Sequence, residues 1–146
     1  MLLSLNEASK PKVSQAPVYK GPDVVIKRSK FYDDTSDKHI DNTVGVESAI
    51  EQFVKHKTKT PMEPFGSKDY ALGNKGNFGN VTGLKHAGLT NDVSVFYTLE
   101  GNAPKVIKLY GVASHDEAGI GQPGNPNRQK NIAKKFANQV FEHSDR

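Results

Sequence analysis

The clearest alternation of hydrophobic and polar positions in this chain lies between residues 93 and 113. In "DVSVFYTLE" every second residue from Val93 to Leu99 belongs to one apolar face, which is the period of two expected of a β-strand. "KVIKLYGVAS" is a second apolar run, and "GNAP" between the two is typical of a turn. A short turn between two strands predicts an antiparallel hairpin in the middle of a sheet. We expect four of its side chains to be buried: Val95, Tyr97, Ile107 and Leu109.

Two other segments have the three- and four-residue spacing of apolar positions that is typical of amphipathic helices. The first is "NTVGVESAIEQFVKHK", which should end near Lys57, ahead of "TKTP". The second should begin at Asn125-Pro126, because proline suits the first turn of a helix, and should run to about Phe141. Its apolar stripe consists of Ile132, Phe136, Ala137, Val140 and Phe141. Its other faces carry Lys130, Lys134 and Lys135.

The remaining pattern indicates shorter elements. "DVVIKRSKF" has the β-branched start of a strand, and glycine divides residues 62–92 into short pieces that suit strands joined by turns. Residues 1–22 hold three prolines without sustained periodicity, so we expect a flexible tail or linker there. The sequence therefore predicts one α+β domain over residues 23–146, with helices packed on a small antiparallel sheet and a basic C-terminal helix.

Composition narrows the possible partners. The chain has 146 residues, no cysteine and a formal net charge of +4. From Lys105 to Lys135 there are six basic residues and only two acids, Asp116 and Glu117. A basic surplus favours anionic partners such as nucleic acid. "MLLSL" is too short for a signal peptide or a membrane span, so we expect a cytoplasmic protein without a membrane partner.

The candidate chemistry rests on histidine. The five histidines have no metal-ligand spacing, so we expect no metal and no cofactor; His39, His56 and His143 lie in polar segments that we expect to be solvated. His86 and His115 differ, because the predicted sheet can bring them together. Imidazole can give or take a proton during phosphodiester cleavage, and Lys85 and Arg128 could balance charge on the phosphate. The alternative interpretation is that both histidines are ordinary polar residues at sheet edges.

The order of the motifs "YALGN", "LTNDVSVFYTLEG" and "VIKLYGVASHDE" resembles the C-terminal half of toxins of the RelE/ParE superfamily, especially the YafQ-like ribosome-dependent endoribonucleases. The resemblance covers roughly residues 23 to 118. It matches His115 to the family's histidine at a strand end and Asp92 to an aspartate before the penultimate strand, and both belong to that branch's active site. Tyr70 falls where the branch often has a histidine, and His86 matches no family histidine, so the identity of the general base stays open.

The resemblance implies a RelE-like fold and a metal-independent endoribonuclease, in which the 2′-OH of the RNA attacks the phosphate and leaves a 2′,3′-cyclic phosphate. The implied partners are RNA, with mRNA on the ribosome as one candidate, and a cognate antitoxin protein. On this hypothesis the catalytic residues are His115, Asp92 and His86. The RNA-binding residues are Lys85, Tyr70, Arg128, Lys130, Lys134 and Lys135. Two alternatives are a non-catalytic RNA- or protein-binding module on the same fold, and the C-terminal nuclease domain of a delivered toxin.

Overall fold

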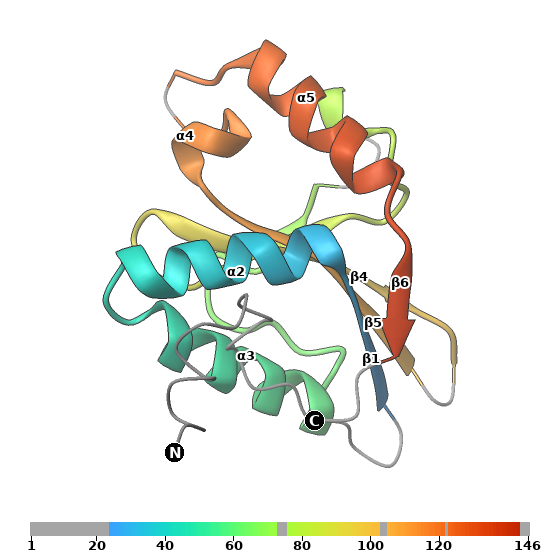
Figure 1. Cartoon of the computed structure of the whole chain (residues 1–146). Helices are drawn as coiled ribbons and strands as arrows, with labels where there is room; N and C mark the ends of the chain where they lie inside the picture. Colours follow the sequence, from blue (N-terminus) through green and yellow to red (C-terminus); the bar gives the residue numbers. More distant parts are fainter. Residues whose placement is uncertain (1–23, 73–75, 103–104, 122, 144–146) are drawn as a thin grey trace, which may run out of the picture.

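The computed structural model describes residues 24–72, 76–102, 105–121 and 123–143 (Figure 1). The expected tail, residues 1–22, lies outside the described residues. The elements follow in the order β1 (Val24–Ser29), α2 (Lys30–Asn42), α3 (Val46–Lys59), β2 (Tyr70–Ala71), the 3-10 turn η1 (Gly76–Phe78), β3 (Lys85–Gly88), β4 (Val93–Glu100), β5 (Lys105–Ser114), α4 (His115–Ala118), α5 (Pro126–Ala137) and β6 (Phe141–His143).

The strands formed by the described residues build one sheet in the order β2-β3-β4-β5-β1-β6. The predicted hairpin is confirmed, since β4 and β5 pair in antiparallel register from Val93↔Ser114 to Glu100↔Val106. The expectation of an antiparallel sheet is corrected at one place, because β1 runs parallel to β5. Parallel neighbours need a long connection, and the helices and strands between β1 and β5 supply one. The fold is therefore α+β with a mixed sheet.

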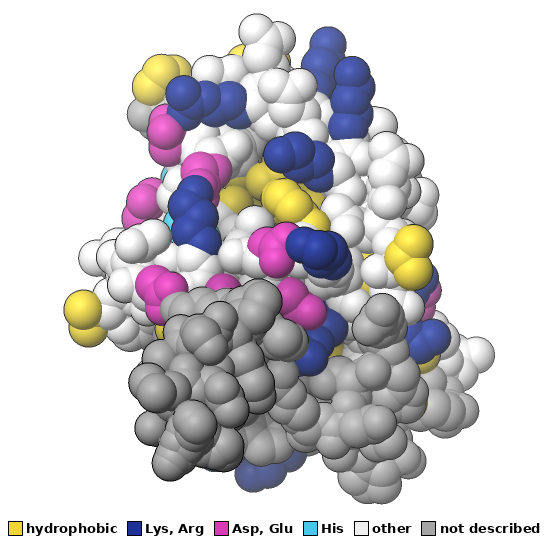
Figure 2. Space-filling view, in the orientation of Figure 1, with side chains coloured by type: hydrophobic (Ala, Val, Ile, Leu, Met, Phe, Trp, Pro, Cys, Tyr) yellow, Lys and Arg dark blue, Asp and Glu magenta, His cyan; other side chains and the backbone are white. Residues whose placement is uncertain are grey.

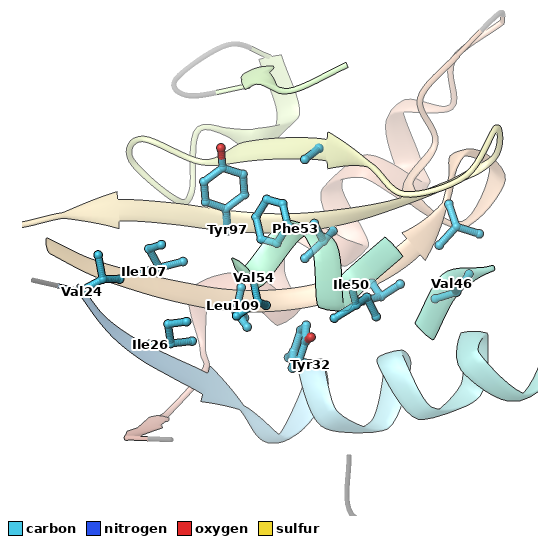
Figure 3. Packing of buried hydrophobic residues seen from close by; sticks show 14 residues of the cluster. Val24, Ile26, Tyr32, Val46, Ile50, Phe53, Val54, Tyr97, Ile107 and Leu109 are labelled. Atoms are coloured by element: carbon cyan, nitrogen blue, oxygen red, sulfur yellow. The ribbon is translucent and has the colours of Figure 1, made fainter. Parts of the chain in front are cut away.

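One face of the sheet packs against α3 and α2 (Figure 3). The alternation seen in the sequence selects this face, and the four side chains expected to be buried are all at most 1% exposed. Phe53 of α3 meets Tyr97 of β4 with ring centroids 5.1 Å apart. The labelled residues of this core are Val24, Ile26, Tyr32, Val46, Ile50, Phe53, Val54, Tyr97, Ile107 and Leu109.

The opposite face carries a second core under α5 and η1. Phe96 of β4 and Phe136 of α5 lie with ring centroids 5.3 Å apart, and Phe78 of η1 stacks on Phe96 at 6.3 Å. Phe96 and Tyr97 are neighbours in sequence, yet they serve opposite cores because successive strand residues point to opposite faces. The sheet is thus covered on both sides, by α3 on one and α5 on the other (Figure 1).

Helix α2 was not predicted, since the strand was expected to continue through Phe31. The strand stops at Ser29, whose hydroxyl caps the helix by accepting from the Tyr32 amide at 3.0 Å. The helix is mostly polar and lies beside β5 beyond the end of β1. There the hydroxyl of Thr35 accepts a hydrogen bond at 2.9 Å from the Val112 amide, which satisfies a strand group that β1 no longer reaches.

The C-terminal helix is shorter than expected. α5 ends at Ala137, Val140 is 80% exposed, and Phe141 belongs to β6, which pairs antiparallel with β1. The start of the helix is as predicted, with Asn125 as the N-cap and Pro126 in the first turn. Phe141 still packs apolar surface, but against Tyr110 at 4.7 Å rather than along the helix. The spacing of apolar residues alone does not distinguish one more helical turn from a short edge strand.

Candidate functional site

A cavity of about 380 Å³ lies where β2, β3 and β4 meet the residues around α4. Its lining includes Lys68, Tyr70, His86, Ser94 and His115, together with the turn at 88–91. The register explains the gathering, because Tyr70 and His86 are directly paired across β2 and β3, and His86 is paired with Phe96 of β4. The structure therefore brings together three residues that the sequence marked separately: Tyr70, His86 and His115.

His86 forms the buried wall of this cavity. It is 3% exposed, and its ring lies 4.5 Å from the ring of Tyr70. Its Nδ1 atom is buried without a hydrogen-bond partner among the other described residues. Burial lowers the pKa of His86 below its ordinary value, and the nearby charge of His115 lowers it further. The ring of His86 therefore lines the cavity with its Nδ1 atom buried and with its charged form disfavoured.

His115 enters the cavity from the first position of α4. The preceding Ser114 and the following Glu117 form a capping box, in which the Ser114 hydroxyl accepts from the Glu117 amide at 3.1 Å and Glu117 Oε1 accepts from the Ser114 amide at 2.9 Å. The His115 amide donates to the Asp92 carbonyl at 2.9 Å. The polar end of β5 is therefore a helix start that fixes the backbone of His115.

Asp92 lies beside His115. Its Oδ1 lies 3.8 Å from His115 Nδ1, which is an ion-pair distance but too long for a hydrogen bond. Both side chains keep access to solvent, with 33% of His115 and 68% of Asp92 exposed. The carboxylate can therefore orient the imidazole loosely while leaving it free to exchange protons.

Glu117 holds α4 against α2 through a second histidine. Its carboxylate lies 2.7 Å from His39 Nε2 and 2.6 Å from Lys38 Nζ. Although partial burial acts to raise the pKa of Glu117, the bonds from Lys38, the Ser114 amide and His39 lower it to about 2. His39 was expected to be solvated, but it is 7% exposed and bonded. His56 is half-buried beside the Glu63 carbonyl at 3.1 Å, and the side chain of His143 lies outside what the structure describes.

The expected cations are not at this cavity. The side chain of Lys85 lies on the opposite face of the sheet from that of His86, and its Nζ is 5.9 Å from the ring centroid of Tyr97. Arg128 binds the Asp116 carboxylate at 2.5 Å and the Asp116 carbonyl at 3.0 Å. Among the described residues, the cation that lines the cavity is Lys68, which was not predicted because it lies in an irregular segment.

Arg128 and Lys135 line a larger cavity of about 490 Å³ between α2, α4 and α5. Its floor is apolar, and Figure 2 shows hydrophobic side chains in a hollow with Lys, Arg, Asp and Glu around it. Lys135 Nζ lies 5.5 Å from the Phe31 ring centroid at this floor. Lys130 and Lys134 are exposed elsewhere on α5. None of these four basic residues of α5 lines the histidine cavity.

A buried ionic cluster, also missed from the sequence, lies under the other face of the sheet. Lys57 and Asp69 pair at 2.8 Å with both side chains 1% exposed. Burial lowers the pKa of Lys57, and the bonds to Asp69 only partly offset this. Burial alone would raise the pKa of Asp69, but the hydrogen bonds from Lys57 and Tyr97 and from the Phe65 amide lower it below its ordinary range. The two side chains are thus held at salt-bridge distance inside the core.

No model of a protein family, no curated protein and no solved structure matches this chain. Within the described ranges, no group of three or more histidine, aspartate or glutamate side chains is arranged to hold a metal ion. None of the helices in that part of the chain has the length and apolarity to cross a membrane. The arrangement of the cavity itself is therefore what indicates a function.

Proposed function

We propose that this protein is a RelE-like, metal-independent endoribonuclease toxin that cleaves RNA at the cavity lined by His86 and His115. One observation carries the proposal: two imidazoles from distant parts of the chain line one cavity, and one of them has a lowered pKa. Paired groups that differ in environment suit the acid and the base of one reaction. The order of β1, two helices and the β3-β4-β5 strands supports the fold assignment.

In the proposed reaction, neutral His86 removes the proton from the 2′-OH of the RNA. The 2′ oxygen then bonds to phosphorus and the bond from phosphorus to the 5′ oxygen breaks. Protonated His115 gives its proton to that 5′ oxygen, so the products are a 2′,3′-cyclic phosphate and a 5′-OH. Asp92 stands beside the charge that His115 carries before this transfer.

Other residues of the cavity bind and position the substrate in this proposal. Lys68 replaces Lys85 and Arg128 as the cation next to the phosphate, because it lines the cavity and they do not. Tyr70 has 49% of its surface exposed and offers a ring on which a base can stack. Arg128 and the lysines of α5 extend the contact to more distant phosphates. The proposed partners remain RNA and a cognate antitoxin in the cytoplasm.

The test is the chemistry of the product ends. The purified protein is incubated with a single-stranded RNA, with the same RNA methylated at every 2′ oxygen, and with the unmodified RNA plus a chelator. We expect cleavage of the unmodified RNA with and without chelator, a 2′,3′-cyclic phosphate on the 5′ fragment, and no cleavage of the methylated RNA. Cleavage of the methylated RNA, or loss of activity in chelator, would contradict the mechanism. Binding without cleavage would favour the non-catalytic module.

A further inference from the structure

We propose that Asp69 is a positioning residue of the cavity: its buried carboxylate holds the segment that presents Lys68 and Tyr70 to His86. The inference rests on the proposed function for its meaning in catalysis, but its structural part can be tested without RNA. Asp69 stands between the two cavity residues in the chain. Its side chain points away from the cavity, into the core under α3, where it meets Lys57 and Tyr97.

The carboxylate of Asp69 is fully engaged. Lys57 Nζ lies 2.8 Å from Oδ2, the Phe65 amide donates to Oδ2 at 2.7 Å, and the Tyr97 hydroxyl donates to Oδ1 at 2.5 Å. Lys57 also donates to the Glu63 carbonyl at 2.7 Å and lies 5.3 Å from the Tyr97 ring centroid. These bonds fasten residues 63–69 to α3 and β4 at several points. An ion pair with this many charge-assisted bonds has a defined geometry.

Residues 63–71 depend on these polar bonds because the segment buries few apolar side chains. β2 has only two residues, and both are exposed. Met62 is 66% exposed, and Phe65 is the main apolar contact, with its ring 5.4 Å from the Phe53 ring. A two-residue edge strand is not stable by itself. The position of Tyr70 over His86 therefore depends on its neighbour Asp69.

Asp69 also acts on His86 through its charge. The titratable groups near His86 are Lys68, Asp69 and Tyr70, which lie in and just before β2, and His115 of α4. Burial, His115 and Lys68 all lower the pKa of His86, whereas the negative charge of Asp69 raises it. Asp69 therefore keeps the proton affinity of His86 from falling further, which matters for a base that must accept a proton near neutral pH.

The experiment follows the His86 ring by NMR in three proteins: wild type, Asp69→Asn, and Glu100→Gln as a matched acid-to-amide control. Glu100 pairs with Lys108 at 3.3 Å, at the end of β4 that lies away from the cavity residue Ser94. In Asp69→Asn we expect the titration midpoint of His86 to move to lower pH, and the nuclear Overhauser effect between the Tyr70 and His86 rings to weaken. The control should change neither signal.

Cleavage of RNA is measured on the same proteins. We expect kcat of Asp69→Asn to fall about 10- to 100-fold, which is the loss expected when substrate-binding residues are displaced by about 1 Å. The control should keep the wild-type kcat. If Asp69→Asn does not fold, the double variant Lys57→Met, Asp69→Asn replaces it, because it leaves no buried charge alone. We expect the same direction of all three changes.

The two proposals fail in different ways. A folded Asp69 variant with an unchanged His86 midpoint and an unchanged Tyr70–His86 ring contact overturns the inference, whatever its activity. A wild-type protein that does not cleave RNA overturns the proposed function, while the two NMR signals still decide whether Asp69 positions the cavity.

Discussion

The short segment from Ser114 to Glu117 contributes to two imidazole–carboxylate pairs. The two pairs differ in the distance between their charged atoms and in their exposure to solvent. His39 and Glu117 are 2.7 Å apart, the histidine is almost fully enclosed, and Lys38 completes the cluster. His115 and Asp92 are 3.8 Å apart, and both remain partly exposed beside a cavity. The comparison shows that residue types do not reveal a role. The enclosed pair is bonded into the fold, whereas the loose pair at the cavity is the one that we propose takes part in catalysis.

The largest expected effect is on the His115 side of this comparison. If His115 transfers a proton at cleavage, His115→Ala should reduce the rate about 10²- to 10⁴-fold, the range of general acid–base groups. Its stability should change little, because the side chain is partly exposed and makes no short hydrogen bond to another described residue. Initial rates on single-stranded RNA and a denaturation midpoint measure the two. His143→Ala is the control and should cleave normally, so equal activity in all three proteins would remove His115 from the mechanism.

Leu109→Ala gives the scale of a purely structural loss. Leu109 is 1% exposed in the core under α3, and removing its side chain should cost about 2–5 kcal/mol of the free energy of unfolding. Denaturant titration measures it. The rate per folded molecule should stay near that of wild type. An unchanged midpoint would contradict the central position of the hairpin.

His39→Ala should show the opposite pattern to His115→Ala. It removes a short bond to a carboxylate from a nearly buried side chain, so we expect a loss of about 1–3 kcal/mol of stability. Cleavage by the folded fraction should be normal, because His39 does not line the histidine cavity. A His39 variant that is stable but inactive would reverse the assignment of the two pairs.

The same pair predicts a dependence of stability on acid pH. The pKa of Glu117 is about 2 in the fold and 4.5 ordinarily. Its contribution to stability is therefore complete above pH 4.5 and is lost as pH falls from there towards 2. Glu117→Gln should be less stable than wild type at neutral pH, and the difference should shrink across that window. Denaturation midpoints at several pH values measure it, and a difference independent of pH would contradict the shift.

The smallest effect concerns the surface of α5, which belongs to neither pair. Replacing Lys130, Lys134 and Lys135 with glutamine should leave stability unchanged, since these side chains are exposed. If all three contact phosphates, the slope of log affinity against log salt should fall by about 2 for single-stranded RNA. Affinity titrations at several salt concentrations measure it. An unchanged slope would place the RNA elsewhere.

The sequence predicted best where a single period dominates. The β4–β5 hairpin, α3 and the start of α5 were predicted because burial follows a repeat of two or of 3.6 residues. α2 was missed because it buries few apolar side chains and depends on a serine cap and on contact with β5. The parallel pairing of β1 was missed because nothing local specifies a partner eighty residues away.

The candidate site was predicted in part for the same reason. His86 and His115 were expected to approach each other from strand order, and they do line one cavity. Lys85 was placed wrongly because adjacent strand residues point to opposite faces, which assigns only one of Lys85 and His86 to the cavity. The capping box was readable as Ser114-x-x-Glu117 before a helix. The Lys57–Asp69 pair was not, because no spacing rule connects α3 to an irregular segment.

The most direct measurement of the central claim is a double-mutant cycle on His86 and His115, using His86→Gln and His115→Ala in initial rates of RNA cleavage. If the two imidazoles are the base and the acid of one reaction at one cavity, their losses should not add, and the double variant should cleave about as slowly as the slower single variant. Full activity in either single variant, or losses that multiply as at independent sites, would contradict the account.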